Sequence, residues 1–182
     1  TYLEPLQPLL SEKTVLSSSM GKEVDRAKKA IDLARTHAVA IVSGGDAGIY
    51  GMASIVLEVL EHEGIQINVE IIPGVTAATA AASRAGSPLS GDYATISLSD
   101  LLTPLEVIEK RLDAVFSVGM PVVLYNPKSR GRPHNLALAL EHAGRYLGDA
   151  TPVAIVRNAL REGEETTITT LGGISEHIDK ID

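Results

Sequence analysis

The chain has 182 residues, of which 45% are hydrophobic, and a formal net charge of −7 from 16 basic and 23 acidic side chains. This composition supports a globular core, and the acidic balance argues against general binding to nucleic acid or to an anionic membrane. Cysteine is absent, no apolar run is long enough to span a bilayer, and residues 1–5 lack a secretory pattern, so we expect a cytoplasmic protein without disulfides or thiolate chemistry.

Helical and strand patterns alternate along the first half of the chain, which predicts an α/β fold. Residues 23–35 carry the apolar stripe of a helix that covers a sheet. The runs at 38–42 and 67–72 predict strands, and helical spacing at 51–62 lies between them. Residues 38–72 should therefore form a Rossmann-like β-α-β unit with parallel pairing.

The alternation continues through the second half. Small side chains at 75–85 predict a closely packed helix that ends at Gly86. The remaining predicted strands are 94–98, 122–125, 153–156 and 165–170, and the remaining predicted helices are 104–116 and 133–147. The last two strands should pair antiparallel around a turn at 161–164. We expect two domains, at residues 1–80 and 81–182.

The loop at 43–51 is the most informative segment, because it joins a predicted strand to a predicted helix and carries four glycines and Asp46. Glycines let a backbone approach a ligand closely, and Asp46 adds an acceptor at the carboxyl end of a strand, where α/β sheets bind ligands. The spacing is neither the dinucleotide fingerprint nor a P-loop. A ligand site is indicated, and a tight turn with Asp46 as a helix cap is the alternative.

Three other loops also follow predicted strands, at residues 73–76, 125–127 and 157–159. A cleft between two α/β halves would collect all of them. In order and spacing, these segments resemble the tetrapyrrole methylases, which use S-adenosylmethionine. The matching segments are the glycine loop, Pro73-Gly74-Val75-Thr76-Ala77, Leu124-Tyr125-Asn126-Pro127, and residues 152–156 leading to Thr170-Leu171.

Within that family, residues 96–104, 107–112 and 125–130 resemble the branch that methylates C-17 of precorrin-3B or cobalt-factor III. The resemblance implies a two-domain α/β methyltransferase of cobalamin biosynthesis, with its cofactor cleft between the halves. It also implies a cyclic tetrapyrrole substrate, contraction of the macrocycle and a homodimer. Two alternatives stay open: a family member with a different acceptor, and a non-catalytic methylase-like module that holds the cofactor.

The chain departs from the family pattern in three ways. The family's opening strand and Gly-x-Gly-Pro-Gly loop are not found before residue 6, so we expect the chain to begin inside the first domain. We also expect the family's final apolar strand to lie beyond Asp182. The sequence Gly45-Asp46-Ala47 replaces the general Gly-Asp-Pro and removes a rigid φ at that point.

Nine positions are expected to contact S-adenosylmethionine. They are Gly44, Gly45, Asp46, Gly48 and Ile49 in the glycine loop and, as the resemblance implies, Thr76, Ala77, Asn126 and Ala159. Asp46 and the glycine amides would hold polar groups of the cofactor, and Ile49 would give apolar contact. Helix capping by Thr76, turn chemistry at Asn126 and simple packing of Ala159 are the alternatives.

A macrocycle rich in carboxylates needs cations or amide donors around it. The residues expected to bind it are Ser97, Ser99, Thr103, Lys128 and Arg130, with Arg132 in the same basic loop. Thr103 should also cap the helix that begins beside Pro104. Asp100 is the candidate for proton transfer, with a turn or helix cap as its alternative. The histidines show no metal-ligand spacing, and we expect surface or capping roles for His37, His62, His134, His142 and His177.

Overall fold

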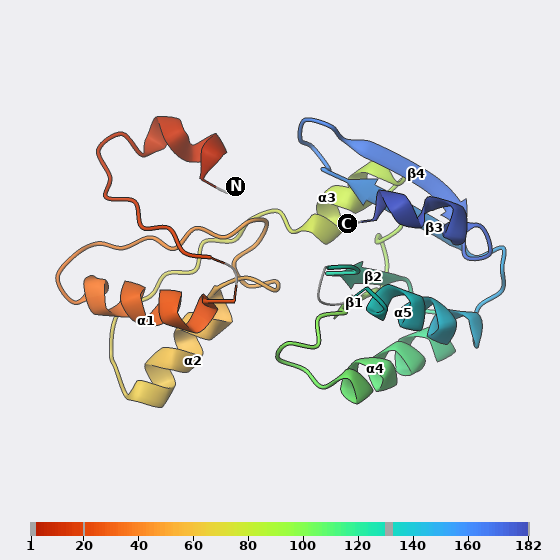
Figure 1. The fold of residues 1–182 in the computed structure, drawn as a ribbon, viewed down its shortest axis with the longest axis horizontal. Coiled ribbons are helices and arrows are strands. Elements are labelled where there is room, and N and C mark those ends of the chain that lie inside the picture. The colour runs from red at the N-terminus through yellow and green to blue at the C-terminus, as the bar shows by residue number, and fades with distance from the viewer. Residues whose placement is uncertain (1–2, 20, 130–132, 182) are drawn as a thin grey trace. The chain divides into compact units, whose positions relative to one another are not determined.

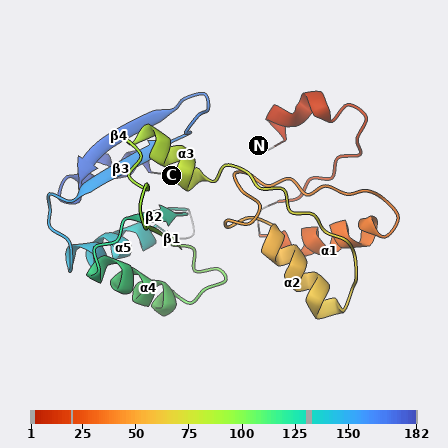
Figure 2. The same cartoon turned by 180° about the vertical axis from the view of Figure 1, so that it is seen from behind.

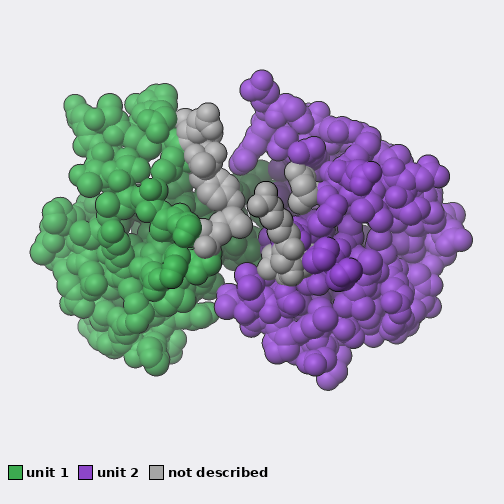
Figure 3. Space-filling model, in the orientation of Figure 1, with its two compact units in different colours: residues 1–76 green, residues 77–182 purple. Residues whose placement is uncertain are grey.

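The protein divides into two compact units, residues 1–76 and 77–182, in a computed structural model that describes residues 3–19, 21–129 and 133–181 (Figures 1 and 3). Each unit has its own apolar core. The predicted domain boundary at residue 80 stays a prediction, because compact units of one chain need not be independent domains. In the part of the chain that the structure describes, no helix is both long and apolar enough to cross a membrane.

The first unit is built on two packed helices. A short 3-10 helix, η1 (Glu4–Leu9), precedes α1 (Glu23–Ala34) and α2 (Ala53–Glu63). Helix α2 is capped at its C-terminal end by Gly64, whose left-handed φ of 64° suits glycine. The buried residues of this unit form one cluster between the helices: Ala27, Ile31, Met52, Val56, Val59 and Leu60. Both helices were predicted from apolar spacing, and both are confirmed.

The two strands predicted for this unit are not formed. Residues 38–42 and 67–72 run without helix or strand, so the predicted β-α-β unit with parallel pairing is wrong. Ile41 and Ile67 pack against the helix cluster, whereas Val42 and Ile72 are exposed. A strand is stabilised by its hydrogen-bonded neighbours and by cover on its faces. These segments have apolar contact on one side and, among the described residues, no ladder partner.

The second unit keeps the predicted alternation of helices and strands. Its elements are α3 (Ala77–Arg84), β1 (Ala94–Ser97), α4 (Leu105–Ser117), β2 (Val122–Tyr125), α5 (Asn135–Gly144), β3 (Pro152–Arg157), β4 (Glu165–Thr170) and the 3-10 helix η2 (Ile174–Lys180). Strands β1 and β2 pair in parallel, with Ser97 opposite Tyr125. Strands β3 and β4 pair antiparallel, as predicted, with Ala154 opposite Ile168. Helix α5 is shorter than the predicted 133–147.

The core of this unit lies between the β1–β2 pair and helices α4 and α5, which run side by side (Figures 1 and 2). Helix α4 presents Ile108, Leu112 and Phe116 to it, one turn apart, which is the spacing that a single buried stripe requires. Leu98, which directly follows β1, is 1% exposed. Burying a side chain of this size contributes about 1.5 to 3 kcal/mol, so Leu98 stabilises the chain directly after β1.

Candidate functional site

Asp46 holds the glycine loop of the first unit together. Its Oδ1 accepts a hydrogen bond from the Gly48 amide at 2.7 Å, and its Oδ2 accepts one from the Gly74 amide at 2.8 Å. The hydrogen bond from Gly74, followed by that from Gly48, lowers the pKa of this carboxyl below its usual range. The carboxylate therefore joins the loop to the Pro73-Gly74 turn, 28 residues along the chain.

The loop and the turn approach so closely that glycine is required. A Cβ on Gly74 would lie 2.2 Å from the carbonyl oxygen of Gly45, and one on Gly51 would lie 2.5 Å from that of Ala47. Gly45 has a φ of 75°, and Tyr50 has a φ of 51° although it carries a side chain. Such a backbone is uncommon outside glycine and gathers at ligand sites. Of the predicted residues, the structure thus brings Gly45, Asp46 and Gly48 together with the turn that precedes Thr76.

In the second unit, the carboxyl ends of β1 and β2 form a polar edge. The Asn126 amide donates from Nδ2 to Ser97 Oγ at 3.0 Å, and the Ser99 backbone amide lies 3.3 Å from the same oxygen. Asn135, at the start of α5, donates to the Leu98 carbonyl at 2.6 Å. Parallel strands end at the same edge, which explains why residues so far apart in sequence meet here. Asn126 itself is left-handed, with a φ of 51°.

Two further contacts tie this edge and the β3–β4 loop to helix α3. The Tyr125 hydroxyl accepts a hydrogen bond from the Ala78 amide at 2.9 Å. Glu164 Oε2 accepts one from the Leu160 amide at 2.5 Å and one from Arg84 Nε at 2.9 Å. The Leu160 amide first, and then Arg84, lowers the pKa of Glu164. Neither Tyr125 nor Glu164 was predicted to have a role of its own. Their contacts with α3 join residues 47 and 80 positions apart, and the contact between Glu164 and Leu160 lies within an ordinary turn.

The predicted substrate residues are placed only in part. Ser97 and Ser99 share the polar edge, and Lys128 lies on the loop after β2. Arg130, together with Arg132, lies outside the described residues. The prediction that Thr103 caps α4 is wrong: Pro104 occupies the N-cap, and no side chain caps the helix. Proline sets φ there at −55° and thereby begins the helix without a side-chain acceptor.

One histidine contradicts the prediction of surface or capping roles. His142 is 2% exposed, and its Nδ1 lies 2.7 Å from Asp113 Oδ1. The hydrogen bond with His142 lowers the pKa of Asp113. His142 belongs to the buried face of α5, and the partly exposed Asp113 of α4 supplies its polar partner. A lone histidine in a sequence gives no signal of such a partner 29 residues away.

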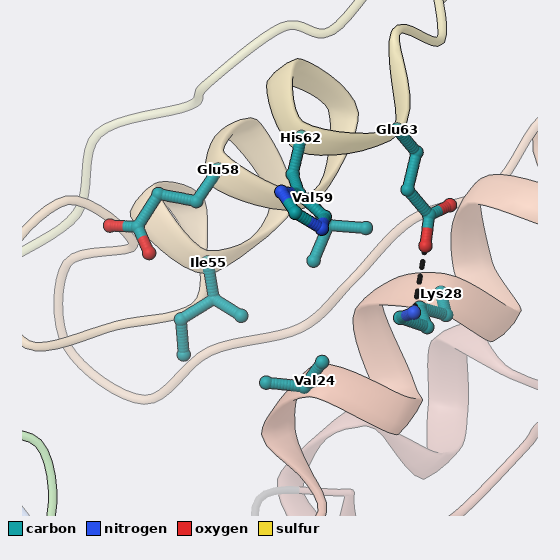
Figure 4. A pocket seen from close by; sticks show the side chains of 7 residues that line it. All are labelled: Val24, Lys28, Ile55, Glu58, Val59, His62 and Glu63. Carbon is teal, nitrogen blue, oxygen red and sulfur yellow. Dashed lines mark ion pairs between the residues drawn. The ribbon is translucent and has the colours of Figure 1, made fainter.

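An open groove of about 500 Å³ lies between α1 and α2 (Figure 4). Its lining is Val24, Lys28, Ile55, Glu58, Val59, His62 and Glu63. Lys28 Nζ and Glu63 Oε1 form an ion pair at 2.7 Å, and this hydrogen bond raises the pKa of Lys28. None of the predicted site residues lines the groove, so we place the candidate site at the loops described above.

Comparison with known proteins gives these loops a common context. A family profile, "Tetrapyrrole (Corrin/Porphyrin) Methylases", matches residues 2–175. The chain is 46% identical over 176 residues to a cobalamin biosynthesis protein of Archaeoglobus fulgidus, CbiHC, covering 97% of this chain and 39% of that protein. It is 45% identical over 173 residues to a probable cobalt-factor III C(17)-methyltransferase of Salmonella typhimurium, covering 94% of this chain and 72% of that one.

A solved structure of a methyltransferase has a fold similar to that of this chain. The crystal structure of the methyltransferase CobJ matches with a TM-score of 0.83 and 34% sequence identity. The match covers 90% of this chain and 70% of that chain. The likeness in fold and sequence extends over both units, since neither unit alone makes up 90% of the residues.

Proposed function

Because the chain belongs to the tetrapyrrole (corrin/porphyrin) methylase family, we propose that it carries the S-adenosylmethionine-dependent methylation of C-17 of precorrin-3B or cobalt-factor III, with contraction of the macrocycle. The observation that supports this most is the 45% identity, over 94% of the chain, to the Salmonella typhimurium relative named for C-17 methylation. The chain spans only part of the length of its relatives, 39% and 72% of the two described above, so the activity is proposed for the whole protein.

The residues of the site suit a methyl donor of this kind. A sulfonium methyl is already activated, so the protein has mainly to bind, orient and keep water away. We assign the polar groups of S-adenosylmethionine to the backbone of Gly44, Gly45 and Gly48, with Asp46 shaping that loop. The close approach of Gly74 to Gly45 and the left-handed Asn126 and Tyr50 support this assignment, because such backbone is kept where a ligand needs it. The remaining proposed cofactor contacts are Ile49, Thr76, Ala77 and Ala159.

For the macrocycle, we propose the polar edge after β1 and β2. Ser97, Ser99 and Thr103 offer hydroxyl groups, and Lys128 and Arg130 offer cations to the substrate carboxylates. Asp100 follows β1 by three residues and is proposed to move a proton during methylation or ring contraction. Both proposed binding regions lie mostly in loops and at the ends of helices and strands, where function is concentrated in folds of this kind.

The test is product analysis with the full-length protein. We expect incubation with S-adenosylmethionine labelled in its methyl group, and with each macrocycle in turn, to place the label on C-17, as read by NMR. Label on another carbon would make the protein a family member with a different acceptor. Cofactor binding without any transfer would identify a non-catalytic module and contradict the proposal.

We also propose a cytoplasmic homodimer with the cofactor between two domains. Family resemblance supports this, together with the small side chains of α3, which permit close packing. Sedimentation equilibrium of the full-length protein at micromolar concentration is expected to give twice the chain mass. A monomer mass under those conditions would contradict the assembly while leaving the chemistry open to its own test.

A further inference from the structure

Helix α3 is tied near both of its ends to other parts of the second unit, the last residue of β2 and the loop between β3 and β4. Near its first turn, the Ala78 amide donates to the Tyr125 hydroxyl at 2.9 Å. Amides of a first helical turn have no partner within the helix, so this hydroxyl satisfies a donor that is otherwise open. At the last turn, Arg84 Nε donates to Glu164 Oε2 at 2.9 Å, and the same oxygen accepts the Leu160 amide at 2.5 Å.

The segments held in this way have unusual backbone geometry. Asn126, the residue after Tyr125, has a φ of 51°, and Asn158 and Leu160, on either side of Ala159, have φ values of 49° and 61°. Asparagine enters the left-handed region more readily than other side chains, whereas a bulky residue such as Leu160 is an outlier there that its surroundings have to hold. Here the hydroxyl and the carboxylate fix the chain directly beside these residues. Helix α3 is the common support of both segments.

We propose that Tyr125 and Glu164 are positioning residues, which hold the backbone at Ala77, Asn126 and Ala159 in the arrangement that S-adenosylmethionine requires before it binds. The proposal rests on the proposed function, since these three residues are its assigned cofactor contacts. Neither Tyr125 nor Glu164 takes part in the chemistry. Both act by preorganisation, because a site that is already ordered does not have to be ordered by the ligand.

The experiment measures binding of S-adenosylmethionine and of S-adenosylhomocysteine to the full-length protein by titration calorimetry. Tyr125→Phe removes one hydroxyl, and Glu164→Ala removes the shared acceptor. We expect each to weaken binding by about fivefold to tenfold, the usual effect of losing one hydrogen bond. Glu164→Gln keeps an oxygen for the Leu160 amide and loses the charge opposite Arg84, so its loss should be smaller. Tyr93→Phe and Glu162→Ala are matched controls at exposed positions and should bind like the wild type.

Steady-state kinetics and thermal unfolding without ligand separate positioning from simple stabilisation. Positioning predicts a raised KM for the cofactor with kcat largely retained, and partial recovery in Glu164→Gln. Unchanged cofactor affinity in Tyr125→Phe and Glu164→Ala, with only a lowered Tm, would overturn the inference. If the wild type bound the cofactor and transferred no methyl group, the proposed function would fail, whereas normal binding in both variants would overturn only the positioning roles. If Tyr125→Phe does not fold, the pair of Glu164 variants still decides the question.

Discussion

At the scale of single residues, the glycine loop is held by the carboxylate of Asp46 and by the absence of a side chain at Gly74. Both oxygens of Asp46 accept backbone amides, one from Gly48 within the loop and one from Gly74 in the turn. The same turn passes the Gly45 carbonyl so closely that a Cβ on Gly74 would lie 2.2 Å away. The missing side chain at Gly74 and the charge of Asp46 thus hold the same arrangement of loop and turn. The two contributions can be tested separately.

The shape is tested by Gly74→Ala. A contact of 2.2 Å to a backbone oxygen forces the loop and the turn apart, so we expect a loss of roughly 1 to 3 kcal/mol in the free energy of unfolding, as in overpacked sites. Urea unfolding followed by circular dichroism measures it. Gly91→Ala is the matched control, because a Cβ there meets no atom within 4 Å. Equal stability of the two variants would show that the turn relaxes without cost.

The charge is tested by Asp46→Asn. The pKa of Asp46 is lowered in the folded protein by the Gly74 and Gly48 amides, so its ionised form is favoured by folding. This contribution to stability is therefore present above the unfolded pKa of about 3.9 and is lost as pH falls through the folded value. We expect Asp46→Asn to be less stable than wild type at pH 7, and the difference to shrink below pH 4.

Urea unfolding of both proteins at pH 7 and at pH 3 measures that difference, with the exposed Asp92→Asn as control. A difference independent of pH would mean that the carboxylate charge does not matter.

Cofactor binding by Asp46→Ala at pH 7 should also weaken, by about fivefold to tenfold, because two backbone amides, one in the loop and one in the turn, lose their acceptor. Unchanged affinity in a folded variant would remove Asp46 from the proposed site.

At the scale of elements, the local pattern predicts helices better than strands in this chain. Helices 23–34, 53–63 and 105–117 follow apolar stripes that pack locally, and all three were predicted. The β-branched runs at 38–42 and 94–97 look alike in sequence, but only the second is a strand. The second has a parallel partner in β2 and cover from α4, whereas the first has no ladder partner among the described residues.

The cover that α4 gives to these strands can be tested at Leu112, which is fully buried among Ile108, Phe116 and the β1 residue Ile96. Leu112→Ala leaves a cavity and should lower the free energy of unfolding by about 2 to 5 kcal/mol. Chemical denaturation measures the loss. Leu102→Ala is a matched control, since Leu102 is 87% exposed and its truncation should change stability by less than about 0.5 kcal/mol. A similar effect of both changes would mean that the α4 stripe is not the core of this unit.

At the scale of the whole molecule, the site could be predicted only as a set of loops. The glycine pattern, a local feature, indicated Gly44, Gly45, Asp46, Gly48 and Ile49, whereas the family resemblance was needed to indicate Thr76, Ala77, Asn126 and Ala159. The contacts of Asp46 with Gly74, Tyr125 with Ala78 and Glu164 with Arg84 join residues 28, 47 and 80 positions apart. No local pattern encodes such pairs, and the same holds for the pair formed by the buried His142 and the partly exposed Asp113.

The net charge of −7 sets a condition on the proposed substrate. The net charge of these 182 residues repels a macrocycle rich in carboxylates, so we expect local cations to provide its attraction. Lys128 and Arg130 follow Asn126-Pro127 closely in the sequence, and we expect their joint replacement by Ala to weaken macrocycle binding by about tenfold with little change in cofactor affinity.

The dependence of macrocycle binding on salt concentration distinguishes attraction by charge from a fit of shape alone. Exposed charge pairs are screened over about 8 Å at 0.15 M, so raising salt from 0.05 to 0.5 M should weaken macrocycle binding to the wild type more than to the double variant. Fluorescence titration with each macrocycle, at several salt concentrations, measures both slopes. The exposed pair Lys13→Ala and Lys29→Ala removes the same charge elsewhere and serves as the matched control. If the control and the Lys128/Arg130 variant show the same loss and the same salt dependence, net charge alone governs binding, and the basic loop is not the macrocycle site.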